Sequence, residues 1–522
     1  MTNQNNESPQ KNYTYYFLGA LLLLFIIVFK YVFNSKLDLN GDNFNYLIYA
    51  RSILSGHGYS SLMYLGYPPA NHYPPGFSAI LSLFMMVVGE NIVSLKILNG
   101  LFLYGSVAVL YLFFVKISGQ KTLSFSIAGL LLLNDYLYHF ATMLMSETSY
   151  LFFSVLAIYA LYKLAERNDF WRSKYFYMMV VSAVTAYYLR AIGITLFGGI
   201  LIYYLFQRKW KLAGAFAGGY FLLYLPWIIR NATLGLKSRY LGVVMTVNPW
   251  RPEEGNISSV SEFIDKMLKN LDETVIKGFT QVIFPFIKPT DNNPSGMPGI
   301  LWGILVVAII LYGAWMLKKY RWLFIAYILG NIFIFSIWHG GNGTRYVVPL
   351  IPFIVFTFYF GIYYLLKLLA ENSFFTKYYA YLILIFAFFM LSPLQETHKI
   401  SAMPYPPAYK NYFEIAKTVG QRTPENTIVS CRKEGMFYWF SHRYSMRYKY
   451  TLDDKELIQN LIDKNFSYVV LDQLGYSSTY RYLYPAIQKN TDLFSTVMVE
   501  KNPDTYLLYF NREKAIEKLK GH

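Results

Sequence analysis

The feature that most constrains the fold is a series of apolar runs, each about as long as a membrane-spanning helix. The first covers residues 13–33, and the others follow at roughly 92–115, 121–140, 148–166, 175–190, 193–207, 211–229, 299–317, 322–338, 346–367 and 378–394. A run of about 20 apolar residues forms a helix that crosses the ~30 Å hydrocarbon core of a bilayer. Because 55% of the residues are hydrophobic and 19% are aromatic, we expect a polytopic α-helical membrane protein with about eleven transmembrane helices.

The basic residues between these runs predict the orientation of the chain. They gather in loops that the order of the spans places on one side of the membrane, and cytoplasmic loops carry an excess of Lys and Arg. We therefore expect a multi-pass protein of the cell (inner) membrane with a cytoplasmic N-terminus. This distribution also accounts for much of the net charge of +17, so no nucleic-acid partner is expected. The clusters are Lys116/Lys121, Lys163/Arg167/Arg172/Lys174, Arg208/Lys209/Lys211, Lys318/Lys319/Arg321 and Lys367/Lys377.

Two segments are ambiguous in the count of spans. Residues 175–207 form one apolar stretch that would be about 50 Å long as a single helix, so a break near Arg190–Gly193 is expected. Residues 77–89 are too few to cross a bilayer and fit an interfacial or re-entrant helix better. Counting them as a span would also invert every later loop.

The order of these segments predicts the domain organisation. Residues 1–12 are polar and are expected to form a loose tail. Residues 13–395 are expected to form a transmembrane domain with external loops at 34–91 and 230–298, the second containing an amphipathic helix at 260–276. Strand-like and helical runs alternate after about residue 396, which predicts a small exoplasmic α/β domain over residues 396–522.

The first external loop contains the strongest candidate for catalysis. It carries two early acids, Asp38 and Asp42, followed by Tyr46, a Gly56-His57-Gly58-Tyr59 break and a Tyr73-Pro74-Pro75-Gly76 segment. Asp42 directly precedes a helical pattern, so it is either an ordinary helix cap or a catalytic carboxylate, and the two roles are compatible.

This order of elements after a first membrane span resembles the first external loop of the GT-C glycosyltransferases. The similarity is greatest to the bacterial branch related to protein O-mannosyltransferases and to the aminoarabinose transferase of lipid A. The resemblance implies a glycosyltransferase for hexosyl or pentosyl groups, with a polyprenyl-phosphate-linked sugar donor and a lipid, glycan or protein acceptor. It implies inverting transfer on the exoplasmic side with Asp42 as the general base, and Asp38 is the second candidate.

The resemblance leaves the cofactor open. Members of the family differ in their dependence on a divalent metal, and many carry a second acid beside the first. Here Asn43 follows Asp42, and the sequence contains no convincing set of metal ligands, so no metal site is assigned.

Two further charged residues lie near predicted helix ends on the external side. Glu147 begins the span at 148–166, where it either interacts with the helix dipole or belongs to the substrate-binding site, as an acid in this loop of the family suggests. Arg190 lies at the break in the stretch 175–207. It either extends to the nearby interface or faces a partner in a polar cavity, and the resemblance favours the second role.

The remaining candidates for substrate binding lie in two loops. Arg345, in Thr344-Arg345-Tyr346-Val347-Val348-Pro349, resembles a family motif in which a basic residue meets a lipid-linked phosphate, although a lone Arg at this depth is commonly an anchor. His339 precedes it and is either structural or part of the same site. Tyr73 and His72 belong to the Tyr-Pro-Pro segment, and His72 either contacts substrate or hydrogen-bonds the loop.

Other classes of protein have less support. Soluble nucleotide-sugar enzymes lack support because no phosphate-binding glycine loop or dinucleotide fingerprint is present. The single cysteine, Cys431, excludes an intramolecular disulfide. The main alternative is a polytopic transporter or lipid flippase with an external domain, which would also use intramembrane Arg and broken helices. Transporters often contain paired repeats, and none is visible between the two halves of this chain.

Overall fold

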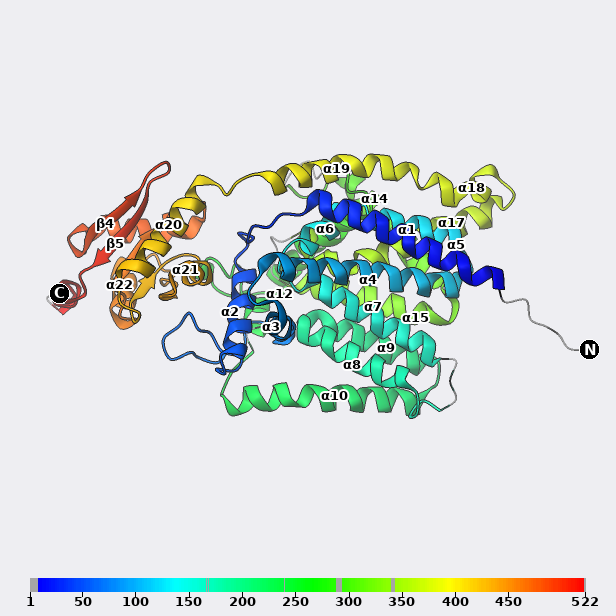
Figure 1. Cartoon of the computed structure of the whole chain (residues 1–522), viewed down its shortest axis with the longest axis horizontal. Helices are drawn as coiled ribbons and strands as arrows, with labels where there is room; N and C mark the ends of the chain where they lie inside the picture. Colours follow the sequence, from blue (N-terminus) through cyan, green and yellow to red (C-terminus); the bar gives the residue numbers. More distant parts are fainter. Residues whose placement is uncertain are drawn as a thin grey trace, which may run out of the picture.

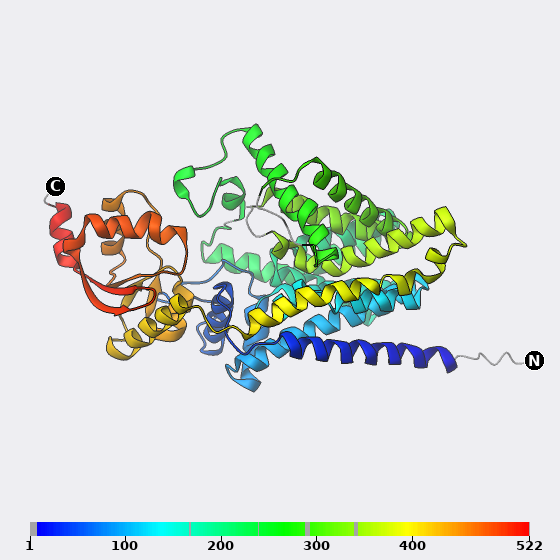
Figure 2. The same ribbon diagram turned by 90° about the horizontal axis from the view of Figure 1, so that it is seen from above.

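The computed structural model describes residues 8–165, 167, 169–238, 240–287, 293–338 and 343–520. Long helices lie side by side in one body, and a smaller domain with a β-sheet lies at one end of it, opposite the N-terminus (Figures 1 and 2). The helices of the body are α1 (Ser8–Val32), α4 (Ile92–Ser118), α5 (Lys121–Leu131), α6 (Asp135–Ala141), α7 (Glu147–Leu164), α8 (Lys174–Leu189), α9 (Ile194–Phe206), α10 (Trp210–Thr233), α14 (Met297–Trp315), α15 (Arg321–Ile337), α17 (Ile351–Ala370), α18 (Phe374–Leu382) and α19 (Ile385–Ala402).

These helices match the apolar runs of the sequence. Among the described residues, seven helical segments are long and apolar enough to cross a membrane by length and composition, and α1, α4, α10, α14 and α15 each account for one of them. The other two are Thr344–Ala370, which ends with α17, and Phe374–Arg422, which contains α18 and α19. The remaining expected spans correspond to shorter helices, namely α5 with α6, α7, α8 and α9. The chain is a multi-pass membrane protein.

Three details can be compared with the expected helix boundaries. The stretch 175–207 does break at Arg190, where the backbone is extended (φ −149°, ψ 130°) before the 3₁₀ turn η1 (Ala191–Gly193). The run after Pro75 forms one short helix, α3 (Gly76–Val88), that does not reach spanning length. The expected loose tail is wrong for residues 8–12, because α1 already begins at Ser8; residues 1–7 lie outside the described part of the chain.

Shorter elements make up residues 34–91 and 230–298, which the sequence predicts to be external and which we call the first and second external segments. The first segment contains α2 (Asp42–Leu54) and α3, and the second contains α11 (Tyr240–Met245), α12 (Val260–Leu271), a π-helical turn at Asp272–Lys277 and α13 (Gly278–Ile283). The expected amphipathic helix at 260–276 thus forms as α12 and the π turn. Before α17, the short helix α16 (Thr344–Val347) and the turn η5 (Val348–Leu350) carry the chain back into the body.

The C-terminal domain is built around a mixed sheet with strand order β2-β1-β3-β5-β4. β1 runs parallel to β2 and β3, and β5 runs antiparallel to β3 and β4. The strands are β1 (Ile428–Ser430), β2 (Tyr444–Met446), β3 (Tyr468–Leu471), β4 (Phe494–Glu500) and β5 (Thr505–Phe510), and the helices are α20 (Pro407–Arg422), α21 (Glu434–Ser441), α22 (Asp454–Asp463), α23 (Tyr484–Lys489) and α24 (Arg512–Lys520). The sequence pattern did not predict β2, α21 or α24.

The C-terminal domain packs directly on the first external segment. A cluster of buried residues runs without interruption from the membrane body into α20, α21 and β1, and α2 and α3 lie between the helical body and the sheet domain (Figure 1). On the second segment, Glu253 bonds Arg481 Nε at 2.6 Å and Tyr482 Oη at 2.7 Å. The sheet domain is therefore held against both external segments.

Candidate functional site

Four charged side chains from distant parts of the chain form one continuous cluster. Arg345 Nη2 lies 2.7 Å from Asp42 Oδ2, and Arg345 Nε lies 3.3 Å from Glu147 Oε1. The same Glu147 oxygen lies 2.7 Å from Arg190 Nη1. The order Asp42, Arg345, Glu147, Arg190 alternates acid and base, so the four formal charges cancel. We call these four residues the charged cluster.

Helix ends place these side chains. Asp42 is the first residue of α2 and Glu147 is the first residue of α7, so both carboxylates lie at the positive ends of helix dipoles. Arg190 lies in the break between α8 and η1, and Arg345 is the second residue of α16. The N-cap residues before the two acids are Gly41 and Ser146, and neither makes a side-chain capping hydrogen bond. The two carboxylates are directed to the arginines.

Access to the cluster differs from residue to residue. Glu147 is sealed, with 0% of its side chain exposed, whereas Arg345 and Asp42 keep 21% and 27%. Arg190 keeps 17%, which shows that it faces a buried partner instead of extending to the interface. A ligand can therefore reach Asp42 and Arg345, while Glu147 bonds both guanidinium groups on their buried side.

Asp42 has a second polar partner in the same loop. Tyr73 Oη donates a hydrogen bond to Asp42 Oδ1 at 2.9 Å. Burial raises the pKa of Asp42, but the charge of Arg345 and the hydrogen bonds from Arg345 and Tyr73 outweigh it, so the pKa lies below its ordinary value. Asp42 is therefore ionised at neutral pH, and each of its oxygens has a bonded partner.

Asp38 belongs to a different environment. Its Oδ2 lies 3.5 Å from Lys96 Nζ, whose side chain is fully buried, and Lys96 also donates to Asn34 Oδ1 at 3.1 Å. Burial, only partly offset by Lys96, raises the pKa of Asp38. This acid is part of a buried ion pair between the loop and α4, separate from the charged cluster.

Of the other expected site residues, the structure places His72 near the charged cluster. The ring of His72 packs edge-on against that of Tyr73, with 4.4 Å between centroids, so it borders the cluster. His339 lies outside the described residues.

Sequence reasoning did not assign a site role to Tyr46 or Ser146, which lie beside the charged cluster. Tyr46 Oη lies 3.4 Å from Ser146 Oγ, and Ser146 Oγ accepts a hydrogen bond from Arg190 Nη1 at 3.4 Å. The position of Ser146 directly before Glu147 is the one signal that pointed to it.

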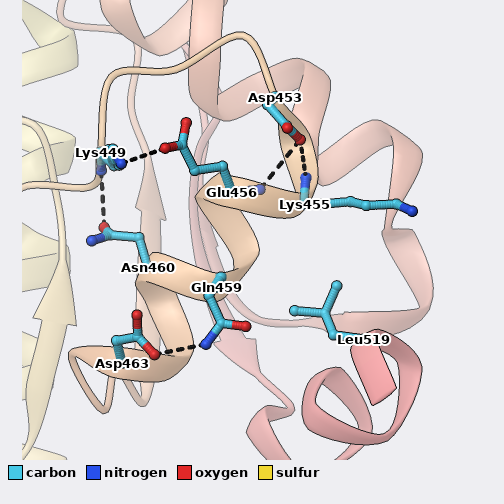
Figure 3. A pocket seen from close by; sticks show the side chains of 8 residues that line it. All are labelled: Lys449, Asp453, Lys455, Glu456, Gln459, Asn460, Asp463 and Leu519. Atoms are coloured by element: carbon cyan, nitrogen blue, oxygen red, sulfur yellow. Dashed lines mark hydrogen bonds and ion pairs between the residues drawn. The ribbon is translucent and has the colours of Figure 1, made fainter. Parts of the chain in front are cut away.

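Two hollows of the surface lie apart from the cluster. The first, of about 440 Å³, is lined only by residues of the C-terminal domain (Figure 3). Within it, Lys449 pairs with Glu456, Asp453 caps α22, and Asp463 accepts a hydrogen bond from Gln459. The second, of about 590 Å³, lies between the loop before α2, the start of α4 and the helices α20 and α21. In the described part of the chain, no group of three or more His, Cys, Asp and Glu residues is placed to hold a metal ion.

Comparison with known proteins gives one sequence match and several similar structures. Residues 57–238 match the family dolichyl-phosphate-mannose-protein mannosyltransferase, and no curated protein sequence matches the chain. The structure of ArnT from Cupriavidus metallidurans bound to undecaprenyl phosphate is similar over 95% of this chain and 98% of that chain, with a TM-score of 0.55 and 12% identity. Its apo state gives the same TM-score and identity over 96% and 98%.

A mycobacterial protein, the arabinofuranosyltransferase AftD, is similar over 94% of this chain and 40% of that chain, with a TM-score of 0.47 and 12% identity. At 12% identity, the similarity to ArnT shows the fold alone. The chain therefore shares the fold of ArnT, and over residues 57–238 its sequence is similar to that of the dolichyl-phosphate-mannose-protein mannosyltransferases.

Proposed function

We propose that the protein is an inverting glycosyltransferase that moves a sugar from a polyprenyl-phosphate-linked donor to an acceptor on the exoplasmic side of the membrane. The observation that carries the proposal is the 2.7 Å contact between Asp42 and Arg345, because it sets a base beside a cation suited to phosphate, and both are partly exposed. The family match and the fold shared with ArnT, whose structure is bound to undecaprenyl phosphate, support this donor class.

In the proposed reaction, Asp42 acts as the general base. It accepts the proton of the acceptor hydroxyl while the oxygen of that hydroxyl attacks the anomeric carbon of the sugar. The bond from this carbon to the phosphate oxygen breaks, and its electron pair stays on the phosphate. The transition state has oxocarbenium character, as in other glycosyl transfers, and one displacement inverts the anomeric configuration.

The arginines of the charged cluster act on the leaving group. A phosphodiester becomes a phosphomonoester when the sugar leaves, so negative charge on the phosphate oxygens grows. Arg345, assisted by Arg190, stabilises this charge, and the contact lowers the barrier because it is stronger in the transition state than in the ground state. Glu147 bonds both guanidinium groups and thereby orients them, while Tyr73 and His72 border the space for substrate.

The shared position of Arg345 links donor binding to base strength. In the unliganded site, Arg345 lowers the pKa of Asp42, which makes the carboxylate a weak base. A donor phosphate competes for the same guanidinium, and the burial of Asp42 then raises its pKa. Asp42 therefore becomes a stronger base when the donor is bound.

The test is an assay of polyprenyl phosphate release by the purified full-length protein. The substrates are polyprenyl-phosphate hexoses and pentoses with lipid, glycan and peptide acceptors. Asp42→Asn keeps the size of the side chain and an acceptor oxygen, so the variant should fold normally, and release should fall by several orders of magnitude because Asn cannot take a proton. Asp265→Asn, an exposed acid on α12, is the matched control and should retain wild-type turnover.

Two outcomes would count against the proposal. Near-normal turnover in Asp42→Asn would reject the general-base role. If the wild-type protein releases no polyprenyl phosphate from any of the donors, the transporter or flippase alternative is favoured.

A further inference from the structure

One lysine of the C-terminal domain reaches the turn that precedes Asp42. Lys433 Nζ donates a hydrogen bond to the carbonyl oxygen of Asn40 at 2.8 Å. The next residue, Gly41, has φ of +103°, and its N–H donates to Asn43 Oδ1 at 3.1 Å. A Cβ added at Gly41 would lie 3.1 Å from Lys433 Nζ. The ammonium group therefore packs against the turn as well as bonding to it.

Lys433 is itself held firmly by the domain that carries it. Its backbone carbonyl accepts a hydrogen bond from Tyr412 Oη at 3.1 Å, and Tyr412 is fully buried. The ammonium group lies 4.6 Å from the centre of the Tyr476 ring. A charge fixed by a ring and a carbonyl has little freedom to move, so the position of the domain determines that of the ammonium group.

The helix that follows Lys433 packs closely on α2. A Cβ added at Gly435 would approach Asn45 Oδ1 to 2.7 Å, and the guanidinium of Arg51 lies 4.3 Å from the centre of the Trp439 ring. These contacts fix the register between α21 and α2. Lys433 thus lies at the end of a tightly packed pair of helices, directly beside the first turn of α2.

We infer that Lys433 is a positioning residue for Asp42, so that the C-terminal domain completes the active-site loop. This inference rests on the proposed function. The turn at Asn40–Gly41 sets where α2 begins, and hence where the Asp42 carboxylate lies relative to Arg345 and the acceptor hydroxyl. A displacement of about 1 Å at a reacting group lowers a rate by about 100-fold. The lysine therefore acts on kcat through geometry, without touching substrate.

The test compares three variants of the full-length protein in detergent. Lys433→Met keeps the apolar stem and removes the charged donor, Lys433→Arg keeps the charge and the donor, and Lys455→Met is a control at an exposed lysine of the same domain. In Lys433→Met we expect kcat to fall by about 10- to 100-fold, with an unchanged KM for the donor and a melting temperature equal to that of the control. Lys433→Arg should retain most of the wild-type kcat.

Amide hydrogen exchange supplies a second readout that does not need turnover. Lys433→Met should speed exchange in residues 38–46 and leave that of residues 147–158 in α7 unchanged. Unchanged exchange in residues 38–46 would overturn the inference, and so would wild-type kcat in Lys433→Met. If the wild-type protein transfers no sugar, the proposed function fails, and the exchange result alone decides whether Lys433 holds the turn.

Discussion

At the scale of single residues, the charged cluster shows why each member needs the others. Glu147 is fully buried and bonds two arginines through one oxygen, and removal of one partner of a buried ion pair leaves a charge without compensation. Arg345 also bonds Asp42. A substitution at Arg345 therefore changes both the proposed phosphate contact and the ionisation of the proposed base.

Arg345→Lys distinguishes a phosphate-binding role from an anchoring role. A guanidinium can bond two phosphate oxygens in one plane, whereas an ammonium acts as a point charge. We therefore expect Lys to lower kcat substantially, and Ala to lower it further, to a loss of about 100- to 1,000-fold. Turnover measured on equal amounts of extracted protein checks this. An anchor alone would lower the yield of inserted protein and leave turnover per molecule at the wild-type value in both variants.

Tyr73→Phe should shift the pH dependence of activity. The pKa of Asp42 is depressed, so the carboxylate is ionised at neutral pH and activity is lost only as the pH falls through that pKa. Removing the Tyr73 hydrogen bond removes one cause of the depression. The acidic limb of the kcat/KM profile should therefore move to higher pH, while activity at neutral pH is largely kept. Tyr67→Phe, in the same loop, is the control, and equal profiles for the two variants would contradict the assignment.

At the scale of elements, helices that begin or break at polar residues bring the cluster together. Asp42 and Glu147 begin α2 and α7, and Arg190 interrupts the path from α8 to α9. Arg345 depends on α17, which continues from α16 and packs very closely on α14. A Cβ added at Gly313 in α14 would overlap the carbonyl oxygen of Thr357 and lie 2.8 Å from the backbone nitrogen of Gly361.

Gly313→Ala should therefore push α14 and α17 apart. Overpacking of a tight contact costs about 1–3 kcal/mol, so we expect a lower melting temperature in detergent and a loss of activity, because Arg345 moves with the start of α17. Gly218→Ala in α10, where an added Cβ would meet nothing within 4 Å, is the matched control. It should be neutral or stabilising by up to ~1 kcal/mol, since Ala favours helix more than Gly. Equal melting temperatures would show that the contact is not tight in solution.

At the scale of the whole molecule, the sheet domain and the membrane body behave as one unit at the site. The main buried cluster extends across both, and Ser445 N–H donates to the Met63 carbonyl oxygen at 3.0 Å across the boundary. The helix α19 also runs through the boundary expected near residue 396. The division at residue 396 and the orientation of the termini remain predictions.

Cysteine labelling of intact cells tests the orientation. Cysteines introduced at Leu65 and Tyr480, both exposed, should react with an impermeant reagent from outside, because the positive-inside rule places the first external segment and the C-terminal domain there. Cysteines at Trp171 and Lys319 should react only after the cells are opened. Background is low, since the native Cys431 is buried. Labelling of Trp171→Cys in intact cells would reject the orientation and the exoplasmic site.

Several features could be predicted from the sequence because they depend on neighbours along the chain. Apolar runs gave the helices of the body, and the break at Arg190 followed from the length of the stretch 175–207. In the C-terminal domain the alternation of strand-like and helical runs predicted a sheet with helices, although it did not predict β2 (Tyr444–Met446). The tail prediction failed because local helix formation extends α1 to Ser8.

The sequence by itself determined that the chain is a multi-pass membrane protein, and it singled out Asp42, Glu147, Arg190 and Arg345 one by one. Their assigned roles remain predictions. Only the tertiary structure decided that they form one cluster, that Asp38 pairs with Lys96 instead, and that Lys433 reaches Asn40. Asp42 and Arg345 are 303 residues apart, and Asn40 and Lys433 are 393 apart. Partners at such separations are set by how helices pack against one another, and no local period or motif records that packing.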